Sequence, residues 1–234
     1  MSSTSGAPAP ATPSADAPVR ATHELGLLLP ADWWVVPLTD RKATHRSLVA
    51  LADRQFGRSD SPPPLKYQSR LAFEEAAATA AAAGGRILAI SLMTVAGAPL
   101  TITLITYRHD PPSRFRGHEK LDRVADRLRG ESDDVEVLLG EAPSGPVLRT
   151  VATERGPDSL GAQDIDQLVV RYLVDCPVEG GGPVRFEAVF TSPHVALRDG
   201  LLDLFDTLVA SVGVIPVESD DTTPMTDAAA VAGA

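Results

Sequence analysis

Residues 87–107, with the sequence ILAISLMTVAGAPLTITLITY, constrain the fold more than any other stretch, because they contain no charged side chain. A helix of this length would be able to cross a lipid bilayer. However, Gly97, Ala98 and Pro99 lie at its centre and mark a turn. The segments on both sides are rich in Ile, Val, Leu and Thr, which suit β-strands. We therefore predict a buried β-hairpin and no membrane span.

The second half of the chain contains further strand patterns. Residues 165–174 alternate between apolar and polar side chains, and residues 184–191 alternate Val, Phe, Ala and Phe with polar or small residues. A run of three glycines at 180–182 predicts a hairpin between these two segments. Shorter strands are expected at 25–29, 33–37, 135–139 and 147–153. Successive strands with tight connections favour an antiparallel sheet.

Four segments have helical signals. Thr39 or Asp40 can cap a helix that runs to about residue 56, and Gly84 with Gly85 ends an alanine-rich helix that starts near residue 68. Residues 119–129 and 201–212 carry apolar side chains at helical spacing. The sequence thus predicts an α+β fold in which a mainly antiparallel sheet packs between helices, as an α/β/α sandwich.

The two ends of the chain differ from the middle in composition. Residues 1–22 are mostly Ala, Pro, Ser and Thr, and residues 217–234 hold acidic residues but no Lys or Arg. Such segments bury too little apolar area to offset the entropy lost on ordering. We expect disordered arms at 1–22 and 217–234, the second one acidic, and a single α+β domain at 23–216.

Charge and cysteine content narrow the class of protein. The formal net charge of −10 argues against a nucleic-acid partner, which usually requires a basic face. Cys176 is the only cysteine, so no intrachain disulfide can form. The N-terminal residues lack the apolar core of a signal peptide, and we expect a cytoplasmic location.

Common catalytic motifs are missing from the sequence: it contains no phosphate-binding loop, no GxGxxG after a strand, no GxSxG and no HExxH. The nearest candidates for chemistry are His109 and His118, which cluster with Asp110 and Glu119 around a proline-rich loop. A loop can bring such groups together on a metal, but we favour a solvated loop beside a helix start, where Glu119 interacts favourably with the helix dipole. We predict no cofactor, no metal and no catalytic residue, with an unrecognised enzyme site near His109 and His118 as an alternative.

Two short segments are candidates for binding a partner. Trp33 and Trp34 are adjacent, so in a strand they point to opposite faces, and one of them can be an exposed anchor. Arg114 and Arg116 flank Phe115 and are suited to an acidic peptide or a phosphate. The alternatives are ordinary packing for the tryptophans and a salt-bridged surface for the arginines.

The order of elements resembles that of PsbP-like domains, also described as Mog-like. The residues that carry the resemblance are LLPADW at 28–33 and VRFEAVFTS at 184–192, followed by a helix containing Leu204, Phe205 and Asp206. The composition, rich in Ala, Arg and Pro, is similar to that of actinobacterial members. The resemblance implies an antiparallel sheet between helices, a role in binding partners, and in some bacterial relatives a role as chaperone for secreted proteins.

These observations favour a non-enzymatic cytoplasmic binding or adaptor protein with a protein partner, of which a secretion-associated chaperone is one form. That hypothesis requires an exposed apolar groove on the sheet, near Trp33 or Trp34. A carrier of a small apolar ligand is a further alternative, with the alanine-rich helix and the uncharged hairpin lining its cavity. The sequence leaves the partner and the oligomeric state open.

Overall fold

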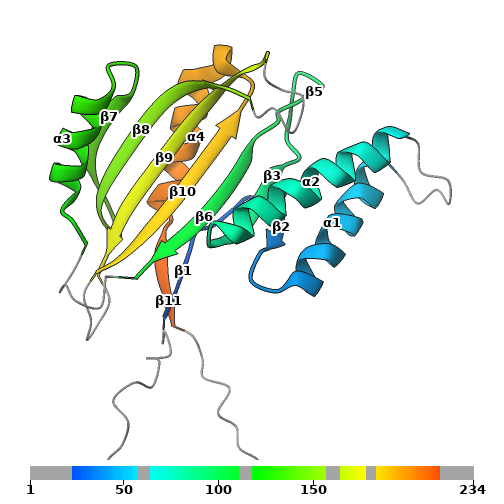
Figure 1. Ribbon diagram of the computed structural model, residues 1–234, viewed down its shortest axis with the longest axis horizontal. Helices are drawn as coiled ribbons and strands as arrows, with labels where there is room; N and C mark the ends of the chain where they lie inside the picture. Colours follow the sequence, from blue (N-terminus) through cyan, green and yellow to red (C-terminus); the bar gives the residue numbers. More distant parts are fainter. Residues whose placement is uncertain (1–22, 57–63, 111–117, 157–163, 178–182, 217–234) are drawn as a thin grey trace, which may run out of the picture.

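The computed structural model describes residues 23–56, 64–110, 118–156, 164–177 and 183–216. These residues form a mainly antiparallel seven-stranded sheet with four α-helices, which confirms the predicted α+β fold (Figure 1). The predicted disordered arms at 1–22 and 217–234 lie outside the described residues, as does the predicted glycine turn at 180–182.

The large sheet has the strand order β2-β3-β6-β10-β9-β8-β7, and every neighbouring pair is antiparallel. Its strands in this order are Trp33–Pro37, Gly85–Ser91, Thr103–His109, Val184–Ser192, Asp166–Cys176, Gly145–Arg155 and Glu136–Ala142. The three central strands β6, β10 and β9 alternate buried and half-buried residues, because side chains point alternately to the two faces of the sheet.

The uncharged stretch forms the predicted hairpin. Strands β3 and β6 pair with Leu88 opposite Ile105, and the tip is a small ribbon of β4 (Thr94–Val95) and β5 (Ala98–Pro99). Ala96 and Gly97 make the turn with φ angles of 51° and 82°, the left-handed region that tight hairpin turns require. Among the described helices, none is both long and apolar enough to cross a membrane.

Helices α1 (Arg41–Phe56) and α2 (Pro64–Ala82) pair with each other and cover one end of the sheet (Figure 1). Asp40 caps α1 as predicted, since its Oδ1 accepts hydrogen bonds from the amides of Lys42 and Ala43 at 2.8 and 3.3 Å. Gly84 follows the end of α2 with a φ angle of 86°, the left-handed conformation that commonly terminates a helix. The two helices and strands β2 and β3 share one core cluster, formed by Val36, Leu38, Leu48, Leu51, Ala77, Ala80, Leu88 and Ile90.

The other two helices complete the layers. Helix α3 (Leu121–Glu131) packs Leu121, Val124 and Ala125 on Leu148, towards the opposite end of the sheet from α1 and α2. Helix α4 (Arg198–Ala210) follows the 3₁₀ turn η2 (Val195–Leu197) and lies behind the sheet in Figure 1. Its Phe205 ring stacks on Phe190 of β10 with centroids 4.2 Å apart. The sheet is therefore packed between helices.

The N-terminal strand differs from the sequence prediction. Residues 25–29 were expected to form a strand next to 33–37, but β1 (His23–Gly26) pairs instead with β11 (Gly213–Pro216) in a separate two-stranded sheet. Residues 213–216 were not predicted as a strand at all. The pairing joins the two ends of the described chain. Because β1 has only four residues and its partner lies at the other end of the sequence, no local sequence pattern indicates which strand it pairs with.

Candidate functional site

The two tryptophans point to opposite faces of the sheet, as adjacent strand residues must. Trp33 is 6% exposed and belongs to the core cluster beneath α4. Trp34 is partly buried against α1, where its Nε1 donates hydrogen bonds to the carbonyl and the hydroxyl oxygen of Ser47 at 3.2 and 3.1 Å. The guanidinium of Arg54 lies over its ring at 5.6 Å. Both indoles thus have a packing role, and partner binding by either stays a prediction.

The structure brings His109 and His118 together at one end of the sheet. Nε2 of His118 lies 2.8 Å from the carbonyl oxygen of His109, and burial lowers the pKa of His118. Nε2 of His109 lies 2.7 Å from a carboxylate oxygen of Glu187, whose other oxygen is 3.2 Å from Nε of Arg171. The ring of Tyr107 stacks on His109.

In this histidine cluster, the carboxylate of Glu187 is shared between the imidazole of His109 and the guanidinium of Arg171. Neither His109 nor His118 lines the cavity between α1 and α2 or the one at the start of α4. Within the described residues, no group of three His, Cys, Asp or Glu side chains is arranged to hold a metal ion. Arg114, Phe115 and Arg116 lie outside the described residues, so their role and an enzyme site in this loop stay predictions.

Cys176 is fully buried at the end of β9. Burial raises the pKa of its thiol to about 11, from an ordinary value of 9.0. Because the thiolate is the nucleophilic form, this cysteine is a packing residue at neutral pH.

An apolar groove opens between the tip of the β4–β5 hairpin and the start of α4. It is a wide depression, open to solvent, with a volume of about 650 Å³. Val95 of β4 and Leu197 of η2, which are 50% and 46% exposed, both line it. The apolar lining is Met93, Val95, Leu100, Ala196, Leu197, Leu201 and Leu204. We refer to these residues as the apolar groove.

Hydrogen bonds hold the two walls of the apolar groove together. The amide of Thr101 donates to Nε2 of His194 at 3.1 Å, and the hydroxyl of Ser192 donates to the carbonyl of Thr101 at 2.9 Å. At the rim, Arg198 forms an ion pair with Asp199 at 3.1 Å and another with Glu136. The groove is therefore a built feature with an apolar centre and a charged edge.

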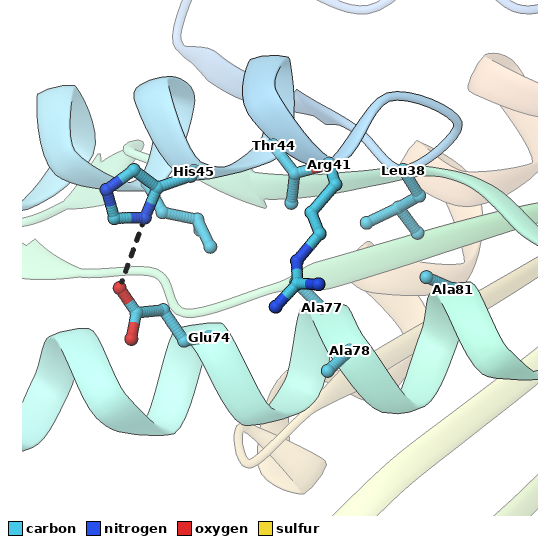
Figure 2. A pocket seen from close by; sticks show the side chains of 9 residues that line it. Leu38, Arg41, Thr44, His45, Glu74, Ala77, Ala78 and Ala81 are labelled. Carbon is cyan, nitrogen blue, oxygen red and sulfur yellow. Dashed lines mark ion pairs between the residues drawn. The ribbon is translucent and has the colours of Figure 1, made fainter.

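A second cavity, of about 440 Å³, lies between α1 and α2 (Figure 2). Its walls are Leu38, Arg41, Thr44, His45 and Leu48 on one side and Glu74, Ala77, Ala78 and Ala81 on the other. Nδ1 of His45 lies 3.7 Å from Glu74, and this ion pair bridges the two helices at one end of the cavity. Because α2 contributes three alanines here, its side chains do not fill the space between the helices.

No family model matches the sequence, and no curated protein matches it. Among solved structures, the fold is similar to that of LpqN, described as involved in cell envelope biogenesis of Mycobacterium tuberculosis. The two share 10% sequence identity over 83% of this chain and 84% of LpqN, with a TM-score of 0.42. A likeness of this size carries no functional argument, and membership of the PsbP-like domains stays a prediction.

Proposed function

We propose that this chain is a non-enzymatic binding protein that acts as an adaptor or chaperone, and that its apolar groove receives an apolar segment of a partner protein. The observation that carries the proposal is the exposure of Val95 and Leu197, which come from different elements and line one groove. Two half-exposed aliphatic side chains that line one groove are suited to anchor an apolar segment of a partner. A charged rim around an apolar centre is also the usual anatomy of a protein interface.

The position of the apolar groove differs from the sequence hypothesis, which placed it on the sheet near Trp33 or Trp34. This groove lies between the hairpin tip and the start of α4, and neither tryptophan lines it. Its residues Leu100 and Leu201 belong to the same core cluster as Trp33. A cytoplasmic location and a secretion-associated role belong to the same proposal, and they rest on the sequence arguments alone.

Simple energetics indicate that the partner covers more than the groove. Full burial of an aliphatic side chain is worth about 1.5–3 kcal/mol, so covering the half-exposed Val95 and Leu197 contributes about 1.5–3 kcal/mol together. Micromolar affinity requires about 8 kcal/mol. The apolar groove is thus an anchor within a larger interface, which extends onto neighbouring surface.

The test is affinity capture from the native host with the full chain as bait, followed by quantitative mass spectrometry. Val95→Asp and Leu197→Asp place a charge in the groove and are expected to lower recovery of a specific partner about tenfold, the effect of 1.4 kcal/mol. Ile165→Asp is the matched control, because Ile165 is similarly exposed but lies outside the groove.

Unchanged thermal melting of the variants would show that the substitutions act on the surface. Equal partner recovery by the wild type and both groove variants would refute the groove as the binding site. Absence of any specific partner would count against the adaptor function itself.

A further inference from the structure

The cavity between α1 and α2 is a second candidate binding site, made by elements that the apolar groove does not use. Its volume of about 440 Å³ falls in the range of small-molecule sites, about 300–1,000 Å³. Leu38, Leu48 and Ala77 provide a buried apolar floor. Ala78 and Ala81 are exposed at its mouth, so the cavity is open to solvent. Its size and floor suit a short alkyl chain.

Arg41 gives this cavity a charge preference. Figure 2 shows its side chain reaching from α1 towards Ala77 and Ala78 of α2. Among the described residues, no carboxylate forms an ion pair with Arg41. The acidic residue that lines the cavity, Glu74, is already paired with His45 at 3.7 Å and with Arg70 at 3.5 Å. The cavity therefore has one uncompensated positive charge.

The position of Arg41 is unfavourable for the helix that carries it. Arg41 begins α1, whose first turn contains no acidic residue. The helix dipole is positive at this end and disfavours cations there. The carboxylate of Asp40, which caps α1 next to Arg41, offsets part of this effect, but the guanidinium itself has no ion-pair partner among the described residues.

We propose that the α1–α2 cavity binds a small amphipathic anion, with a carboxylate or phosphate head on a single alkyl chain. The head group pairs with the planar guanidinium of Arg41, which can donate two parallel hydrogen bonds to either anion. The alkyl chain lies on Leu38, Leu48 and Ala77. The proposal is independent of the adaptor function, because the apolar groove involves β4, β5, η2 and α4.

The experiment is isothermal titration of the purified full chain with decanoate and with decyl phosphate, each below its micelle concentration, and with decanol as the neutral comparison. We expect saturable binding of one anion per chain. Arg41→Gln should weaken that binding about tenfold, while Arg46→Gln should not, since Arg46 is an exposed arginine of the same helix outside the cavity.

Ala78→Leu tests the cavity itself, because the larger side chain occupies the space for the alkyl chain. Ala78 is exposed and leucine is a good helix former, so we expect α2 to be retained and binding to be lost. Thr79→Leu introduces the same side chain at a neighbouring exposed position that does not line the cavity, and it should bind normally. Ala81→Leu repeats the test if circular dichroism shows that Ala78→Leu perturbs the fold.

Three results would overturn the proposal. They are absence of saturable binding by both anions, full binding by a folded Ala78→Leu or Ala81→Leu variant, and binding of decanol as tight as that of the anions. Preferential binding of decanoate or of decyl phosphate would identify the head group and support it.

Discussion

Asp206 shows how a single side chain ties a helix to the sheet. Its two carboxylate oxygens accept hydrogen bonds from the hydroxyl of Tyr172 at 2.7 Å and from Nη1 of Arg149 at 2.5 Å. Burial and the neighbouring carboxylate raise the pKa of Tyr172 well above its ordinary value of 10.0, so the hydroxyl keeps its proton and donates it to this bond. These contacts link α4 to strands β8 and β9.

We expect Asp206→Ala to destabilise the protein by about 1–3 kcal/mol, because it removes the acceptor of two hydrogen bonds, one of them from a charged group. Urea unfolding followed by tryptophan fluorescence measures the change. Asp203→Ala is the control, since Asp203 lies on the same helix and its side chain forms no hydrogen bond or ion pair within the described residues. Equal stability of the two variants would show that the link contributes nothing.

At the scale of elements, the connection from α2 into β3 depends on one close approach. A Cβ atom at Gly85 would lie 2.7 Å from the carbonyl oxygen of Ala80 and 3.0 Å from Cδ1 of Leu38. The carbonyl belongs to the end of α2 and has little freedom to move. Gly130, inside α3, has no atom within 4 Å of the corresponding position.

Replacing each of these two glycines by alanine should therefore have opposite effects on the stability of the protein. Gly85→Ala should destabilise the protein by about 1–3 kcal/mol through overpacking. Gly130→Ala should stabilise it by up to about 1 kcal/mol, because alanine is the better helix former. The melting temperatures of both variants test these two predictions. A lower melting temperature for Gly130→Ala than for Gly85→Ala would contradict the steric argument.

The helices themselves were largely predictable from local pattern. Asp40 marks the start of α1, and Gly84 marks the chain reversal that follows α2. Both can be identified from the sequence because capping depends on residues that are neighbours along the chain. The spacing of Leu201, Phe205 and Val209 likewise identifies the buried face of α4. The apolar groove was not predictable in the same way, since Val95 and Leu197 come from elements that meet only in the folded chain.

At the scale of the whole molecule, β1 and β11 bring the two ends of the described chain side by side (Figure 1). His23 pairs with Pro216, and the amide of Leu28 donates to the hydroxyl of Ser211 at 2.9 Å. Both expected arms therefore join the fold at the same small sheet. This closure holds the N-terminal segment against the end of α4.

Truncation tests this role and the predicted domain limits together. A chain of residues 23–216 should melt at the same temperature as the full chain, because every described strand and helix is kept. Removing 213–216 as well should lower the melting temperature by at least about 2 °C, the shift that 1 kcal/mol produces at this size. A lower melting temperature for 23–216 would show that the arms contribute to folding, against the prediction from composition.

The sequence alone determined the helices, the central hairpin and the antiparallel character of the sheet, because caps, turns and periodicity act between residues that are close along the chain. It also placed Trp33 and Trp34 on opposite faces, since alternation is a property of any strand. The tertiary structure decided the partner of β1, the burial of each tryptophan, and the positions of the apolar groove and the α1–α2 cavity. Each of these depends on segments distant in sequence that line the same space, such as Val95 and Leu197 or Arg41 and the alanines of α2. Local pattern carries no information about which distant surfaces meet.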